Sequence, residues 1–281
     1  MPKNRTPPTV DEREGIVRAV NSVFARTACF ASLVALIAPT VAGYGHGSRG
    51  NEQSPQRQAP KRAYHGDDEL TRLRDSAARG DVQSAWDLCQ LYNGVPPDSF
   101  RGKHVAQDDA VAVEWCRRAA THGHLRASGT LAAMFYTGRG VSQDFAQALH
   151  WIQPPATAGV SEAQYLLGLL YANGHGVQRD ESQAFSWFLK SAEQGYAFAQ
   201  ISVAAQYLSG QGTKRDQLEA QKWFNVCARR ESDAQNKCIV DRDMHAKRLS
   251  GADLAEAQKR ADQWFASCPR PAEPRWNVVC Q

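Results

Sequence analysis

The sequence lacks the motifs of the common serine acyl-enzymes. No Ser-x-x-Lys, Lys-Thr-Gly or Gly-x-Ser-x-Gly occurs among its 281 residues, and these are the usual ways of presenting an activated serine. The Cys-x-x-Cys of disulfide exchangers is missing too. His122 and His124 lie two residues apart, but no second cluster has zinc-ligand spacing, which favours polar turn residues over ligands. The sequence therefore predicts no catalytic residue, no cofactor and no metal site.

Strong charge and a full-length apolar span are also lacking. The formal net charge is +4, which offers no basis for a nucleic-acid or polybasic membrane partner. The uncharged run at residues 27–40 follows Arg26, is interrupted by Pro39, and falls short of the ~20 apolar residues that a bilayer needs. With Val41-Ala42-Gly43 after it, the run is typical of a cleaved secretory signal peptide; an uncleaved anchor is the alternative. The long polar lead is also consistent with translation starting downstream, near Val23.

What the sequence does have is a repeat. Trp115, Trp151, Trp187 and Trp223 are 36 residues apart, and glycine, aspartate and alanine positions recur in step with them. A period in this range indicates one supersecondary unit stacked on copies of itself. Such arrays offer long surfaces, so the period favours a binding function.

Each unit reads as a helical hairpin. In residues 161–195, apolar and small residues recur at helical spacing in both halves. Gly174 and Gly176 between the halves suit the positive φ values that end a helix, and Asp180 suits the N-cap of the second helix. Trp187 reads as a core residue. In the preceding unit, Pro154-Pro155 is expected to interrupt the second helix and bend the stack.

These patterns divide the chain into five segments. Residues 1–42 form the signal peptide with its long polar lead, and residues 43–66, rich in Gly, Ser, Gln and Pro, form a flexible linker. Residues 67–231 hold an N-terminal capping helix and four repeats. Residues 232–268 form C-terminal capping helices, the last beginning at a capping-box-like Ser250-Gly251-Ala252-Asp253, and residues 269–281 form a tail.

The cysteines support export. Cleavage after Ala42 removes Cys29 and leaves an even set of six, which indicates disulfides and an oxidising compartment, the periplasm or beyond. The hairpin geometry favours three pairs: Cys89 with Cys116, Cys227 with Cys238, and Cys268 with Cys280. An alternative to export is that the array stays inside the cell behind an uncleaved segment. The even number of cysteines argues against this alternative.

The pattern A-x-x-x-L-G-x-x-Y-x-x-G-x-G-V-x-x-D-x-x-x-A-x-x-W-x-x-x-A-x-x-G, read from Ala163 to Gly195, closely resembles the Sel-1-like repeat, a relative of the tetratricopeptide repeat. The resemblance covers about residues 67–230. It implies an all-α, right-handed superhelical solenoid of antiparallel helix pairs that acts as an adaptor or scaffold for other proteins.

The resemblance also implies where a partner binds. In related tetratricopeptide arrays the first helix of each pair lines a concave groove. The positions on that helix that vary between repeats give six candidates, namely Trp86, Asp87, Gln90, Tyr136, Tyr165 and Leu169. Aromatic and mixed polar side chains suit an extended peptide or another protein. The alternative is that Tyr165 packs against the next repeat. The face carries no basic ladder, which argues against a carboxylate-clamping groove.

The sequence thus predicts a non-enzymatic, protein-binding scaffold of the bacterial cell envelope, periplasmic or secreted, with no integral membrane span after cleavage. The alternative is a β-lactamase-like or peptidoglycan-fragment hydrolase. It follows from exported, cysteine-rich relatives of this family, and so rests on analogy alone.

Overall fold

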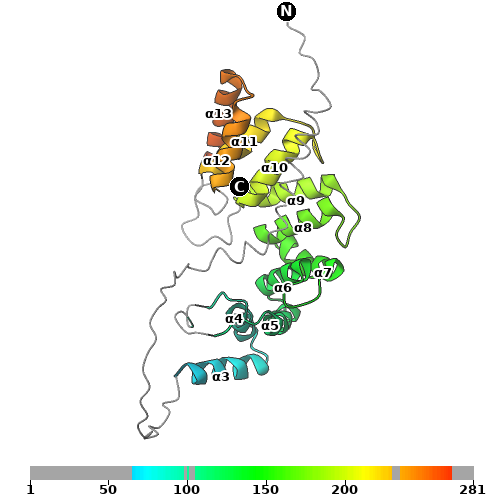
Figure 1. The fold of residues 1–281 in the computed structure, drawn as a ribbon, viewed down its shortest axis with the longest axis vertical. Coiled ribbons are helices and arrows are strands. Elements are labelled where there is room, and N and C mark those ends of the chain that lie inside the picture. The colour runs from blue at the N-terminus through cyan, green and yellow to red at the C-terminus, as the bar shows by residue number, and fades with distance from the viewer. Residues whose placement is uncertain (1–64, 98–99, 101–104, 230–234, 268–281) are drawn as a thin grey trace, which may run out of the picture.

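The computed structural model describes residues 65–97, 100, 105–229 and 235–267. The expected signal peptide, linker and tail lie outside these residues. The described chain forms a curved stack of α-helices (Figure 1). The helices, in chain order, are α3 (His65–Ala78), α4 (Val82–Tyr92), α5 (Asp109–Thr121), α6 (Leu125–Thr137), α7 (Phe145–Thr157), α8 (Ser161–Asn173), α9 (Glu181–Glu193), α10 (Ala197–Ser209), α11 (Gln217–Arg229), α12 (Gln235–Ala246) and α13 (Gly251–Ser267).

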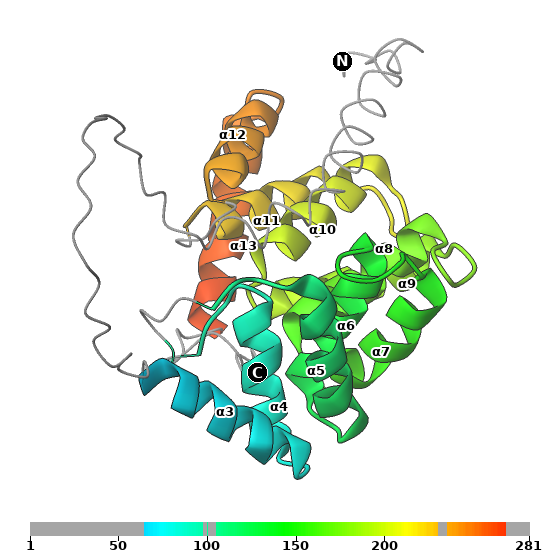
Figure 2. The same cartoon turned by 60° about the horizontal axis from the view of Figure 1, so that its bottom comes forward.

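Four helix pairs make up the repeats: α4 with α5, α6 with α7, α8 with α9, and α10 with α11. The pairs follow a curved path, with α4, α6, α8 and α10 on its inner side and α5, α7 and α9 on its outer side (Figure 2). The structure confirms the expected all-α solenoid of helix pairs.

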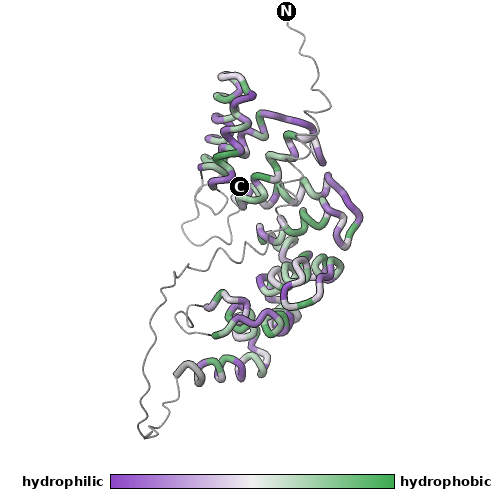
Figure 3. The backbone as a smooth tube through the Cα atoms, viewed as in Figure 1, coloured by the Kyte–Doolittle hydropathy of each residue, from purple (hydrophilic) through white to green (hydrophobic). Residues whose placement is uncertain are grey.

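Local sequence explains where each helix begins and ends. Gly174 ends α8 in the left-handed region at φ 68°, which costs a glycine little. Asp180 begins α9 by accepting hydrogen bonds from the backbone N–H groups of Ser182 and Gln183 at 2.9 Å each. The turn between them is hydrophilic (Figure 3). Both roles agree with the sequence prediction, and equivalent glycines and aspartates repeat them along the stack.

The repeated tryptophan lies in the core at Trp223, which is 1% exposed, but only at the edge of the core in the other three repeats. Trp187 is half-buried at the edge of the core, and the Lys190 ammonium lies 4.2 Å from the centre of its ring. Its neighbour Phe188 is fully buried instead. Trp187 was predicted as a core residue, and it does pack against the core, but from the edge: one face of the indole packs and the other is left to a cation.

The two prolines do not interrupt α7, which runs from Phe145 to Thr157 through both of them. The prediction of an interrupted helix was wrong. Both proline carbonyls still accept hydrogen bonds, from Ala158 N–H to Pro154 at 3.0 Å and from Val160 N–H to Pro155 at 2.9 Å. The last turn therefore closes, although the prolines themselves donate nothing.

Additional helices pack on both ends of the array. α3 packs on α4, and both α12 and α13 pack on α11. The expected capping box begins α13, because Ser250 Oγ accepts from Asp253 N–H at 3.1 Å and donates to the Asp253 carboxylate at 2.8 Å. Within the described ranges, no helix has the length and apolarity that crossing a bilayer requires.

Two disulfides join helices. Cys89 on α4 pairs with Cys116 on α5, and Cys227 on α11 pairs with Cys238 on α12. All four cysteines are fully buried. These are two of the three expected pairs; Cys268 and Cys280 lie outside the described residues. The first disulfide fixes the first hairpin, and the second ties the C-terminal helices to the last repeat.

Candidate functional site

The candidate partner surface is the inner face, the side of α4, α6, α8 and α10 that faces the concave side of the curve (Figure 2). Its two halves differ in exposure. On α4 and α6, the variable positions are half-buried, whereas on α8 they are buried. We call the half-buried part the open half and define it as Trp86, Asp87, Gln90, Thr130 and Tyr136.

Trp86 is held by the next repeat. Its ring stacks on the His124 ring with centroids 4.9 Å apart, and His124 Nδ1 accepts a hydrogen bond from Ala127 N–H at 3.2 Å as the N-cap of α6. Burial lowers the pKa of His124, as does the charge of Arg126, while the Asp87 carboxylate opposes the shift. A neutral imidazole can therefore cap α6 and support the indole together.

Asp87 and Gln90 lie on the same helix as Trp86, one turn apart. The Asp87 carboxylate accepts a hydrogen bond from Gln83 Nε2 at 2.8 Å. Both Asp87 and Gln90 remain partly accessible to solvent. Together with Trp86 they offer an aromatic edge, a charge and an amide within one helical turn, which is a mixture typical of protein-binding surfaces.

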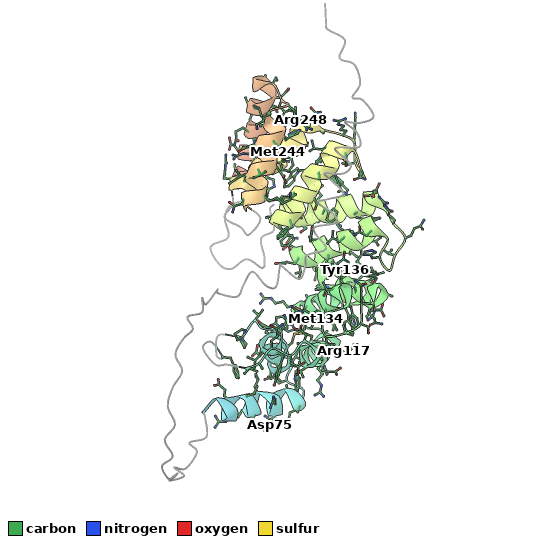
Figure 4. The ribbon with its side chains drawn as sticks, in the orientation of Figure 1. Asp75, Arg117, Met134, Tyr136, Met244 and Arg248 are labelled. Carbon is green, nitrogen blue, oxygen red and sulfur yellow. A yellow bond between two sulfur atoms is a disulfide. The ribbon has the colours of Figure 1, made fainter. Side chains whose placement is uncertain are left out.

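Tyr136 lies where α6 meets α8 (Figure 4). Its ring centroid is 5.6 Å from that of Phe145 and 5.8 Å from that of His175. Burial raises the pKa of Tyr136, and a hydrogen bond with the Asn173 side chain acts against the rise. This residue both joins two repeats and keeps part of its ring at the inner face.

Tyr165 and Leu169 are not available to a partner, since each is only 3% exposed. The Tyr165 ring packs against Phe188 and Tyr196, with centroids 5.4 Å and 5.2 Å away. Burial raises its pKa to about 12, and its hydroxyl bonds the Ser202 side chain. These two candidates are corrected: α8 carries apolar residues on nearly every side, so packing within the stack encloses them.

The two histidines considered as ligands point to separate backbone groups. His122 Nδ1 bonds the Arg118 carbonyl at 2.8 Å, whereas His124 Nδ1 caps α6. No group of three His, Cys, Asp or Glu side chains suited to a metal ion occurs within the part of the chain that the structure describes. His124 matters for another reason, as the support of Trp86. This role was not predicted from the sequence, and the equivalent residues Val160 and Tyr196 make no side-chain cap bond that could have indicated it.

Comparison with known proteins identifies the repeat. The family model described as Sel1 repeat matches residues 83–124, 131–159, 161–196 and 197–226. These four matches follow the four helix pairs closely. No curated protein matches the chain.

Two solved structures are similar. One is a protective antigen present in uropathogenic Escherichia coli strains that displays an SLR fold; it is 28% identical with a TM-score of 0.62, over 70% of this chain and 40% of that one. The chain thus spans less than half the length of that antigen. The other is a Sel1 repeat protein from Oxalobacter formigenes, 22% identical with a TM-score of 0.53, over 69% of this chain and 77% of that one. With its four matched repeats and this fold, the chain belongs to the Sel1-like repeat family.

Proposed function

We propose that the chain is a non-enzymatic adaptor of the bacterial cell envelope that binds a protein or an extended peptide on the open half of its inner face. Sel1 repeat proteins are generally protein-interaction scaffolds. The observation that carries the proposal is the contrast along the inner face. Trp86, Asp87 and Gln90 stay partly exposed on α4, while packing encloses the equivalent side chains of α8.

The chemistry of the open half supports a polypeptide partner. Trp86 is already ordered by its stacking on His124, so binding costs little side-chain entropy there. The Asp87 carboxylate favours a partner that brings a hydrogen-bond donor or a cation. Gln90 can both donate to and accept from an extended backbone.

Site-specific photo-crosslinking in bacteria tests the surface. A benzoylphenylalanine at Gln90 on α4 should capture one defined partner, and Asp87→Lys in the same chain should abolish the capture. The matched control places the crosslinker at Glu114, an exposed residue of α5 in the same hairpin. Equal capture from position 114, or none from position 90, would rule out the open half as the binding surface.

The envelope location is proposed from the signal-like run and supported by two buried disulfides. Intact mass of protein from a periplasmic fraction, taken with and without reduction and alkylation, tests it. A mature chain beginning near Gly43 with three disulfides is expected. A full-length chain with free thiols would contradict the location.

The hydrolase alternative remains open to a direct assay. The purified protein, with its disulfides intact, should leave a chromogenic β-lactam unhydrolysed. Turnover that survives purification to a single species would replace the adaptor proposal with an enzymatic one.

A further inference from the structure

A pocket of about 370 Å³ lies at the junction of α3, α4 and α5, and no residue of the open half lines it. The ends of α3 and α5 and the start of α4 form it, and these three helices lie together at one end of the stack (Figure 2). Its apolar lining includes Ala77, Val82 and Ala85. The volume falls at the small end of the range for ligand sites.

The same place is filled in the third repeat. There, Gln164 occupies the position of Ala85, and its Nε2 donates to the Ala156 carbonyl at 3.3 Å. Its Oε1 accepts from Gln194 Nε2 at 2.7 Å. The fourth repeat repeats the first of these contacts, with Gln200 Nε2 donating to the Ala192 carbonyl at 3.1 Å. In both repeats a glutamine therefore seals the seam between successive helix pairs.

In the first repeat the sealing side chain is replaced by a methyl group. The counterpart of Ala156 is Ala77, whose carbonyl accepts from Gly80 N–H at 3.1 Å, just as Ala156 accepts from Gly159. Ala85 is too short to reach this carbonyl. The pocket is thus the space of a missing glutamine, and it retains the carbonyl that the glutamine amide would have bonded.

The basic residues of the pocket wall set its charge. Arg79, Arg118 and His122 all line it, and His122 stands where the third repeat has Gln194. The Arg118 guanidinium lies 4.7 Å from the centre of the Trp115 ring, which positions it. The one carboxylate of the lining, Asp81, is engaged by Ser84 and Ser76 as the N-cap of α4. The two guanidinium groups outweigh this single negative charge, so the lining keeps a net positive charge that suits an anion.

We propose that this pocket binds the carboxylate of an amino acid whose own nitrogen is acylated, as at a peptide C-terminus or in a free N-acyl amino acid. The carboxylate pairs with Arg118 and Arg79, and the adjacent amide N–H donates to the Ala77 carbonyl in place of the missing glutamine. The apolar lining at Val82 and Ala85 accepts a small aliphatic side chain. This site is separate from the open half and does not depend on the proposed function.

Calorimetric titration of the full chain, with its disulfides intact, tests the proposal. N-acetyl-L-alanine should bind with a millimolar Kd, and N-acetyl-L-alaninamide, which lacks the carboxylate, should bind at least tenfold more weakly. The peptide Gly-Gly-Ala with a free C-terminus is the second probe. If it binds more tightly than N-acetyl-L-alanine, the natural source is a peptide terminus; if it binds more weakly, the source is a free N-acyl amino acid.

Three variants distinguish binding in the pocket from nonspecific binding elsewhere on the protein. Ala85→Gln should fill the space as Gln164 does and weaken binding at least tenfold, and Arg118→Gln should do the same while leaving the space empty. Lys190→Gln is the matched control, since Lys190 is the counterpart of Arg118 in a repeat whose seam is sealed. It should bind normally. If Ala85→Gln fails to fold, Arg118→Gln decides.

The proposal fails if neither acid probe binds the wild-type chain, if the amide binds as well as the acid, or if the Arg118→Gln variant binds as tightly as the Lys190→Gln control.

Discussion

The ring of Phe188 on α9 occupies the space that a side chain at Gly168 on α8 would need. A Cβ atom at position 168 would lie 2.6 Å from the Phe188 Cδ1 and Cε1 atoms. Phe188 is fully buried and cannot turn away without disturbing the core. We therefore expect Gly168→Ala to destabilise the protein by roughly 1–3 kcal/mol, measured as a fall in the urea midpoint.

Gly129 provides the matched control. It lies within α6, and a Cβ atom there would meet no atom within 4 Å apart from its chain neighbours and the backbone of its own helix. Gly129→Ala should leave the stability unchanged or raise it by roughly 0.5–1 kcal/mol, because alanine favours a helix over glycine. The urea midpoint should therefore stay the same or rise. Equal effects of the two substitutions would show that the contact with Phe188 does not limit position 168.

The disulfide between Cys89 and Cys116 should contribute strongly to stability. It closes a sequence separation of 27 residues, for which chain entropy gives about 3–4 kcal/mol. We expect the double substitution Cys89→Ala with Cys116→Ala to lower the unfolding midpoint accordingly. Reduced wild-type protein should show the same midpoint or a lower one, since reduction opens the second disulfide as well. A double variant as stable as the oxidised wild type would show that helix packing alone fixes the first hairpin.

The sequence predicted the features that depend on neighbouring residues in the chain. Gly174 and Asp180 end and begin helices through their own backbone and side-chain chemistry, so they could be assigned without knowing what packs on them. The first two disulfides could be assigned from the hairpin alone because each joins adjacent helices.

Features that depend on the next repeat were harder to predict. Trp187 and Phe188 are adjacent on α9, and only the stack decides that Phe188 faces inward. Tyr165 was a candidate contact residue, yet Tyr196, from the turn before α10, helps to enclose it. Periodicity gives the phase of a helix but not how closely the following helix approaches.

Stability should fall in mild acid because of His245. The residue lies buried on α12, with its Nδ1 atom 2.8 Å from Gln221 Oε1 of α11 and its ring 6.0 Å from that of Phe224. Burial, followed by the charges of Arg248 and Arg215, lowers its pKa from 6.5 to about 4. The fold therefore disfavours the protonated form, whereas the unfolded chain takes up the proton readily.

His245 therefore lowers the stability of the fold in acid only. Above pH 6.5 the residue is neutral in both the folded and the unfolded state, and stability does not change. As the pH falls from 6.5 to 4, protonation of the unfolded chain lowers the free energy of unfolding by at most about 3 kcal/mol. Amide exchange of α12 at pH 7.5 and pH 4.5 should show this loss. His245→Gln should reduce the difference between the two pH values, and an undiminished difference in that variant would assign it to other groups.

Tyr165→Phe separates packing from partner binding. The substitution removes the hydroxyl that bonds the buried Ser202 and leaves the ring in place. The protein should lose about 1 kcal/mol of stability because the buried hydrogen bond between the two hydroxyls is lost, while Ser202 Oγ keeps its donation to the Phe198 carbonyl at 3.0 Å. Since Tyr165 is enclosed, photo-crosslinking from position 90 should be unchanged. If capture falls while the unfolding midpoint does not, Tyr165 belongs to the partner surface after all, and α8 must open when the partner binds.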